Sequence, residues 1–393
     1  MTSFILFDGS ERSALLPFTY TRPIADIRVG ILTIREKWEY YLKAKTSTLT
    51  ENYLAKKYPL HTGDDYIYIN GSVLPDLNIL KAIQHLKYTE VLLSESKTII
   101  AYRSETQMSP EEIENFNKIT FEGSVDRIAN TWDIFSKNGD AIKNDYELLT
   151  SDRVSQVLPD TVRASRSENI FIEEGAEIEY CIINATAGPV YIGKNAKILD
   201  GSILRGPLAI CENAIIKLGA KIYGETTIGP GSKVGGEINN AVFFANSNKA
   251  HDGYVGNSVI GEWCNLGADT NTSNLKNNYA EVRLWNYDAE RFSPTGLQFC
   301  GLMMGDHSKC GINTMFNTGT VIGVNVNIFG SGFPRNFVPS FSWGGASGFT
   351  TYQTRKAFEV MRAVFTRKNL QVSETDLQIM EHIFEITKKW RKD

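Results

Sequence analysis

The sequence predicts an α/β domain, then a left-handed parallel β-helix of hexapeptide repeats, then C-terminal helices. Strands and helices alternate in the first part of the chain, an aliphatic residue recurs at every sixth position in the middle, and amphipathic segments follow. The expected parts are an α/β domain over residues 1–150, a linker over 151–168, the β-helix over 169–330, and an irregular segment with helices over 331–393.

Composition limits the kinds of partner. The 393 residues include 41 basic and 45 acidic side chains, so we expect no basic surface for nucleic acid or an anionic membrane. No segment has the apolar length needed to span a bilayer. The five cysteines are widely spaced and lack a CxxC pair, which favours buried thiols in a reducing, cytoplasmic compartment over disulfides or a zinc site. Small molecules or proteins remain as partners.

The N-terminal domain is predicted from its alternating pattern. The expected strands are residues 4–8 and 66–70, and the expected helices are 24–42 and 77–86, in a mostly parallel sheet. The loop after the first strand contains Gly9, Arg12 and Arg22. Backbone N–H groups and guanidinium groups bind phosphate, so this loop is a candidate phosphate site, although a glycine after a strand is most often only a turn.

The β-helix is predicted from a strict period of six. Three hexads form one triangular coil, each aliphatic side chain points inward, and stacked coils share one core. The predicted inward residues are Ile172, Ile178, Ile192, Ile198, Leu204, Ile210, Ile216, Ile222, Ile228, Val234, Ile260, Leu266, Met304, Cys310, Phe316, Ile322 and Ile328.

The period fails twice, at about residues 237–255 and 272–298, and both stretches are expected to leave the coil. A rigid scaffold carries function on such loops, which makes His251 in the first break a candidate. The helices expected over 351–366 and 374–391 would pack on the end of the coil, where unpaired strands would otherwise be exposed.

Two stretches resemble a known family. HDGYVGNSVIGEWCNLGADTNTSNL resembles the acetyltransferase signature of the bifunctional N-acetylglucosamine-1-phosphate uridyltransferase/glucosamine-1-phosphate N-acetyltransferase family, and LFDGSERSALLPFTYTRP resembles a shortened form of its nucleotidyltransferase fingerprint. The resemblance covers nearly the whole chain. It implies a transferase of sugar-nucleotide biosynthesis that acts on a sugar phosphate and a nucleotide, uses acetyl-CoA as co-substrate and assembles as a homotrimer.

In the β-helix, the resemblance makes His251 the general base that takes a proton from the amino sugar, a task for which a neutral imidazole is suited. It also implies sugar contacts by Tyr254 and Asn265, and acetyl-CoA contacts by Ala268, Asn274 and Leu275.

Basic contacts to the sugar phosphate depart from the family pattern. The positions of two family lysines align near Asn239 and Ala280. Lys249 and Arg205 are candidates to supply the positive charge, although either can simply be a solvated coil corner.

In the N-terminal domain, the resemblance implies nucleotide and sugar-phosphate contacts by Gly9, Arg12, Arg22, Asn70 and Gly71. Where the family places a metal-binding aspartate after glycine, this chain has Ser72. A Mg²⁺ ion bound with a nucleoside triphosphate would need other carboxylates, and the candidates are Asp76, Asp133 and Asp145.

Two other interpretations stay open. The chain could be a nucleotidyltransferase whose β-helix is structural, or a non-catalytic scaffold that binds nucleotide sugars. A zinc hydratase would need three clustered histidines, whereas the predicted coil contains His251 and His307. The sequence does not specify the sugar, the nucleobase or the acyl group.

Overall fold

A computed structural model describes residues 2–391. The chain forms two compact units. The first contains the residues up to 27, 32–130 and 374–379, and the second contains 28–31, 131–373 and the residues from 380 onward. The second unit therefore begins at residue 131 and not at 151, because two helices before residue 151 pack on the β-helix.

The first unit contains a six-stranded sheet in the order β2-β1-β3-β5-β4-β6. Its strands are β1 (Thr2–Phe7), β2 (Thr46–Leu49), β3 (Asp65–Asn70), β4 (Glu90–Leu93), β5 (Ile99–Ser104) and β6 (Asn117–Thr120). Its helices are α1 (Ile34–Leu42), α2 (Asn52–Ala55) and α3 (Leu77–Gln84). β5 runs opposite to the other five strands, so the prediction of a mostly parallel sheet is confirmed.

Strand β3 forms the centre of this sheet, and all its residues are buried. Tyr68 on β3 stacks on Tyr102 of β5, with ring centroids 4.5 Å apart. Because the five parallel strands point the same way, the loops that follow β1, β3, β4 and β6 meet at one edge of the sheet. That edge carries the first candidate site.

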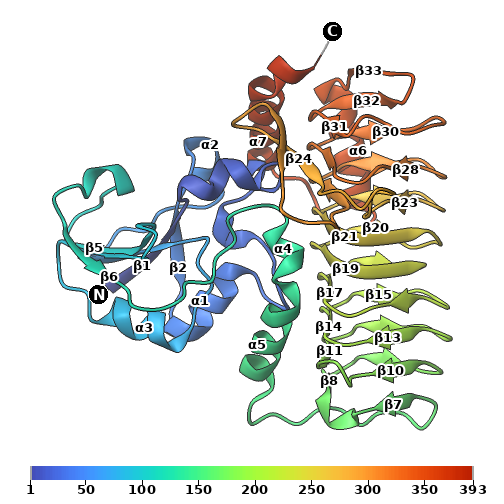
Figure 1. The fold of residues 1–393 in the computed structure, drawn as a ribbon, viewed down its shortest axis with the longest axis horizontal. Coiled ribbons are helices and arrows are strands. Elements are labelled where there is room, and N and C mark those ends of the chain that lie inside the picture. The colour runs from blue at the N-terminus through green and yellow to red at the C-terminus, as the bar shows by residue number, and fades with distance from the viewer. Residues whose placement is uncertain (1, 392–393) are drawn as a thin grey trace. The chain divides into compact units, whose positions relative to one another are not determined.

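The second unit is a left-handed β-helix whose strands stack in successive coils (Figure 1). One face contains β8 (Ile170–Ile172), β11 (Val190–Ile192), β14 (Leu208–Ile210), β17 (Thr226–Ile228), β26 (Leu302–Met304), β29 (Thr320–Ile322) and β31 (Phe337–Val338). A second face contains β9 (Glu177–Ile178), β12 (Lys197–Ile198), β15 (Ile215–Ile216), β18 (Lys233–Val234), β20 (Asn248–Lys249), β22 (Asn265–Leu266), β27 (Lys309–Cys310), β30 (Asn327–Ile328) and β32 (Ser342–Gly345).

The third face contains β7 (Arg163–Ser165), β10 (Ile182–Asn184), β13 (Ile203–Arg205), β16 (Lys221–Ile222), β23 (Asn271–Thr272) and β28 (Met315–Phe316). Two longer strands, β19 (Glu237–Phe243) and β21 (Tyr254–Ile260), bend from the third face into the first.

The predicted inward stack is confirmed. Every aliphatic, aromatic or cysteine residue that the period of six selects lies in one buried cluster. The coil is longer than expected, however. β7 already pairs with β10 inside the expected linker, and β31 and β32 continue the stack beyond residue 330.

The first period break is not an excursion, which corrects the prediction for residues 237–255. Ile238, Phe243 and Val255 stay in the inner stack, and the coil is merely shortened. Asn240 and Asn257 adopt φ angles of 44° and 45°, which allow the chain to turn a corner within one continuous strand.

The second break is an excursion, as predicted. The chain leaves the coil after β23 and returns at β26, and the two ends of the loop lie together because Cys300 N donates to Asn274 O at 2.9 Å. Within the loop, β24 (Arg283–Asn286) and β25 (Arg291–Pro294) form an antiparallel hairpin.

The C-terminal helices are α6 (Thr354–Thr366) and α7 (Glu374–Ile386), and α6 corrects the expectation that the helices cap the coil end. α6 runs along a corner of several coils, with Phe365 stacked on Trp263 at 4.1 Å and Met361 against Asn325. Instead, β33 (Gly348–Thr351) pairs with β32 at the last coil.

Two further helices, α4 (Asp133–Ser136) and α5 (Asn138–Thr150), belong to the second unit. Ile142 on α5 packs with Phe171, Tyr191 and Ala209, which point outward from the first face of the coil. These helices therefore cover part of that face. Among residues 2–391, no helix is long and apolar enough to cross a bilayer.

Candidate functional site

The loop after β1 is tied down by its own side chains. The Arg12 guanidinium contacts Asp8 at 2.7 Å, the hydroxyl of Tyr53 at 3.0 Å and the carbonyl oxygens of Thr19 and Arg22. Burial raises the pKa of Asp8, while the adjacent Arg12 charge opposes that rise. Arg12 thus cross-links the loop, which is a different role from the expected contact with a triphosphate.

The other expected nucleotide contacts also have structural roles. The side chain of Asn70 donates to Ile99 O and accepts from Ser72 N, and Gly71 N donates to Phe7 O at 2.8 Å. Arg22 is buried within the loop. Gly9 gives room for Glu11, because a Cβ at Gly9 would lie 2.4 Å from the Glu11 carboxylate.

Glu11 and Arg127 form a pair that the sequence did not reveal. The Glu11 side chain is 6% exposed, its Oε1 contacts Arg127 Nη1, and its buried Oε2 has no hydrogen-bond partner among the described residues. Arg127 follows β6 and lies 116 positions away in the chain. Only the sheet topology brings the two together, so no local motif could have predicted them.

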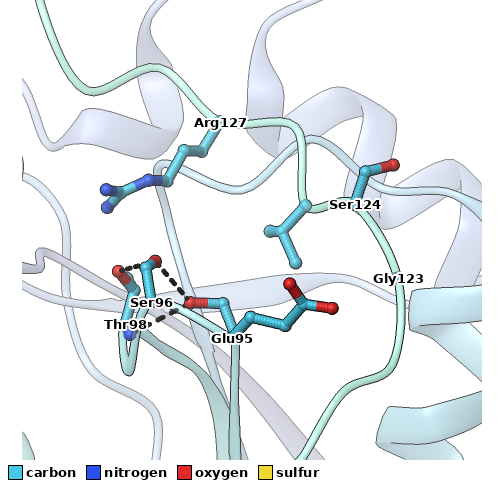
Figure 2. A pocket seen from close by; sticks show the side chains of 8 residues that line it. Glu95, Ser96, Thr98, Gly123, Ser124 and Arg127 are labelled. Atoms are coloured by element: carbon cyan, nitrogen blue, oxygen red, sulfur yellow. Dashed lines mark hydrogen bonds between the residues drawn. The ribbon is translucent and has the colours of Figure 1, made fainter.

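Arg127 also lines an open pocket at this edge (Figure 2). The hydroxyl groups of Ser96 and Thr98 and the carboxylate of Glu95 also line this pocket (Figure 2). Ser94 Oγ lies 2.9 Å from Ser96 Oγ. Gly123 and Ser124 close the rim. A cation facing several hydroxyl groups can bind the phosphate or hydroxyl groups of a sugar phosphate.

The proposed metal ligands do not fit a Mg²⁺ site. Asp76 caps α3 by accepting hydrogen bonds from Asn78 N and Ile79 N, and buried Asp145 accepts from Ile31 N at 2.8 Å. Asp133 lies in α4. Within residues 2–391, no three metal-ligating side chains cluster together. We therefore derive no step through a metal held by these residues.

The second candidate site is the coil corner at residues 250–253. His251 is exposed there, and the corner joins β20 on the second face to β21 on the third. Ala268 and Ile312 occupy the same corner position in the next two coils. An open groove of about 540 Å³ begins nearby, lined by Asp269, Asn271, Ile312, Asn313, Met315 and residues 330–332.

Tyr254, Asn257 and Asn274 form a polar cluster at the other end of the third-face part of β21, where that strand bends into the first face. The Asn274 amide donates to the Tyr254 hydroxyl at 3.0 Å and to Asn257 Oδ1 at 2.7 Å. Gly256 lies beneath, and a Cβ there would be 2.2 Å from the Tyr254 hydroxyl. The structure therefore brings Tyr254 and Asn274 together, and Leu275 follows directly in the base of the excursion.

Asn265 and Arg205 occupy outward positions on the coil. Asn265 Oδ1 accepts from Asn248 on the preceding coil at 2.8 Å, which forms a short amide ladder. Arg205 is exposed on the third face.

Lys249 corrects the expectation of a surface contact with a sugar phosphate. Its side chain points into the coil and is fully buried, and its ammonium group donates to the carbonyl oxygens of His251 and Asp252. Burial lowers the pKa of Lys249 to about 8, and the charge of Asp252 partly opposes this effect.

Comparison with known proteins shows which families parts of this chain resemble. Residues 4–154 match the model of a sugar nucleotidyl transferase family. The uncharacterized acetyltransferase YaiX of Escherichia coli is 32% identical over 149 residues, which are 37% of this chain and 64% of YaiX. The chain is thus similar in part to a sugar nucleotidyl transferase family and in part to an uncharacterized acetyltransferase.

Two archaeal bifunctional proteins are also similar to parts of this chain. The bifunctional protein GlmU of Methanocaldococcus jannaschii is 35% identical over 89 residues, or 23% of this chain and 21% of that protein. The bifunctional sugar-1-phosphate nucleotidylyltransferase/acetyltransferase of Sulfurisphaera tokodaii is 29% identical over 144 residues, or 36% of this chain and 35% of that protein. The chain is a divergent relative of these bifunctional proteins.

This chain spans less than two thirds of the length of each of these relatives. A solved UDP-N-acetylglucosamine acyltransferase from Francisella novicida matches 57% of this chain and 88% of its own, at 13% identity and a TM-score of 0.23. At that score the similarity carries no argument about function.

Proposed function

We propose that this protein is a two-site transferase of sugar-nucleotide biosynthesis. The β-helix transfers the acetyl group of acetyl-CoA to the amino group of an amino sugar phosphate, and the N-terminal domain transfers a nucleotidyl group to a sugar 1-phosphate. The observation that carries the proposal is the exposed imidazole of His251 on a corner whose backbone is held from inside the coil.

In the acyl-transfer step, the amino nitrogen attacks the thioester carbonyl carbon and His251 removes the proton that the nitrogen loses. Collapse of the tetrahedral intermediate forms the amide bond, breaks the C–S bond and releases coenzyme A. Tyr254, whose hydroxyl accepts a hydrogen bond from Asn274, would bind the sugar, and Asn274 would contact the acetyl-CoA. Ala268 and Leu275 would border the acetyl-CoA, and Asn265 and Arg205 would contribute polar contacts from the coil surface.

The acyl-transfer test is thiol release from acetyl-CoA with glucosamine 1-phosphate as acceptor. We expect release by the wild-type protein and its loss in His251→Ala. Leu218→Ala is a matched control, because Leu218 is an exposed residue at the same corner position of an earlier coil. Equal rates in wild type and His251→Ala would contradict the assignment of the base.

The nucleotidyl-transfer test is pyrophosphate release from UTP or dTTP with N-acetylglucosamine 1-phosphate or glucose 1-phosphate. Arg127, which Glu11 holds in place, and the hydroxyl groups of Ser94, Ser96 and Thr98 would bind the sugar phosphate. Mg²⁺ would enter with the nucleoside triphosphate. Loss of pyrophosphate release in Arg127→Gln, with thiol release unchanged, would support this assignment.

A second candidate function concerns the N-terminal domain alone. Arg12 and Asp76 of the first unit both have partners within the chain, and Asp145 lies in the second unit, which favours a domain that binds a nucleotide sugar without turning it over. Saturable binding of UDP-N-acetylglucosamine without pyrophosphate release from any tested pair would support this alternative.

Assembly and location are part of the same proposal. Ile182, Ile203 and Ile312 are exposed on the coil, and such side chains suit a homotrimer contact. Native mass spectrometry should show three chains. All five cysteines are buried and none is in a disulfide, which fits a reducing cytoplasm.

A further inference from the structure

Lys249 occupies an inward position that apolar residues take in neighbouring coils. In the register of the second face, Val234 precedes it and Leu266 follows it, and both belong to the buried cluster. A buried ammonium group is destabilising unless it is hydrogen-bonded. The ammonium group of Lys249 donates hydrogen bonds to the carbonyl oxygens of His251 and Asp252. Its hydrogen-bond acceptors therefore lie in the corner that carries His251.

The backbone stacking explains why this corner needs an internal donor. In a regular corner, a backbone N–H group donates to the carbonyl oxygen of the second corner residue in the preceding coil. Gly219 N donates in this way to Asp200 O, and Asn313 N donates to Ala268 O. At the corner of residues 250–253 the acceptor is shifted by one residue, because Asp269 N donates to Asp252 O at 3.0 Å. Lys249 supplies the hydrogen bond to His251 O.

The preceding coil contacts the corner of residues 250–253 through the backbone of Gly235 and Gly236. Val234 and Lys249 are 15 positions apart, whereas Ile216 and Val234 are 18 apart, so the corner at Gly235 and Gly236 is short. A Cβ at Gly236 would lie 3.0 Å from His251 O. Thus Lys249 holds the corner from inside and Gly236 allows its close approach.

We infer that Lys249 is a positioning residue for His251, fixing the corner backbone so that the imidazole is presented at one place on the coil surface. This inference rests on the proposed acyl transfer. Lys249 touches neither substrate, and it acts through the two carbonyl groups.

The role predicts a specific kinetic signature. A displacement of about 1 Å at a reacting group can cost on the order of 100-fold in rate. Lys249→Met should therefore lower kcat for thiol release by about tenfold or more. The KM for acetyl-CoA should change by less than about twofold, because substrate contacts are unchanged.

The experiment compares Lys249→Met with Lys309→Met. Lys309 is a matched control, since its ammonium group also donates to a corner carbonyl, His307 O at 2.9 Å, on a different corner of the coil. Steady-state thiol release gives kcat and KM, and hydrogen exchange of the peptide that contains residues 250–253 reports on the corner without needing activity. Lys249→Leu, which repeats the residue type of Leu266 in the next coil, serves as a second variant should the methionine variant fail to fold.

We expect a lower kcat and faster exchange at residues 250–253 in the Lys249 variants, with both quantities near wild type in Lys309→Met. Unchanged exchange in a folded Lys249 variant, or an equal loss of kcat in Lys309→Met, would overturn the positioning role. Absence of thiol release in the wild-type protein would overturn the proposed acyl transfer instead, and the exchange comparison would still decide whether Lys249 fixes the corner.

Discussion

Lys249 should make stability depend on pH in a defined direction. Burial lowers its pKa to about 8 against 10.5 for a free lysine, with Asp252, Cys310 and Asp269 opposing the shift. Between these values the unfolded chain holds the proton and the folded chain releases it, so the free energy of unfolding rises with pH. Relative to Lys249→Met, the wild-type protein should gain about 2 to 3 kcal/mol between pH 8 and 10.5. Denaturant titrations that give parallel pH profiles for the two proteins would contradict this.

Arg12 should matter for folding of the N-terminal domain. Arg12→Ala leaves the buried Asp8 carboxylate without its guanidinium partner, which should cost about 3 to 5 kcal/mol in the free energy of unfolding. Arg166→Ala, which removes an exposed pair with Glu168, should change it by less than about 1 kcal/mol. If Arg12→Ala had normal stability and a raised KM for the nucleotide, Arg12 would be assigned to triphosphate binding instead.

Gly256 should be required for the Tyr254–Asn274 contact. A methyl group at Gly256 would be 2.2 Å from the Tyr254 hydroxyl and 2.7 Å from Asn274 Nδ2, so Gly256→Ala must displace both side chains. We expect a loss of about 1 to 3 kcal/mol in stability and a raised KM for the amino sugar. In Gly311→Ala the nearest atom is 3.7 Å away, and a comparable effect there would argue against the mechanism.

The excursion between β23 and β26 should be needed for substrate binding but not for folding of the coil. None of its residues belongs to the inner stack, and its ends are held together by the Leu275–Phe299 bridge. Replacing residues 276–298 with an Asn-Gly turn should leave the coil folded, as circular dichroism would show. The KM for the amino sugar should rise by about tenfold if the loop borders the site. Loss of the β-sheet signal would show instead that the loop holds the coil together.

Elements with a strict period could be predicted from the sequence, and those that depend on local exceptions could not. The hexads predicted the inner stack because each inward position needs an apolar side chain. Residues 237–255 looked like an excursion because a lysine took an inward position and two asparagines allowed tight corners. α6 looked like a cap because its apolar stripe does not specify which surface it covers.

At the scale of the whole molecule, the candidate residues fall into two groups. His251, Tyr254 and Asn274 come from one continuous stretch, and the structure brings Asn274 to Tyr254, which begins the strand after the His251 corner. Glu11 and Arg127 could not be found, because a sheet of distant strands brings them together. Arg12 and Lys249 were assigned to ligands because sequence alone does not show which way a charged side chain points.

The two proposed activities should be separable within one protein. His251→Ala should lose thiol release and retain pyrophosphate release, whereas Arg127→Gln should show the reverse. Parallel loss of both activities in either variant, in a protein that remains folded, would contradict two independent sites.

The most direct test of acetyl transfer by the β-helix is the rate of thiol release from acetyl-CoA with glucosamine 1-phosphate, measured for the wild-type protein and for His251→Ala at matched folding. We predict steady release by the wild-type protein and a loss of about 100-fold or more in the variant, as expected for removal of a general base. Equal release by both proteins, or none by the wild-type protein with any amino-sugar acceptor, would contradict this assignment.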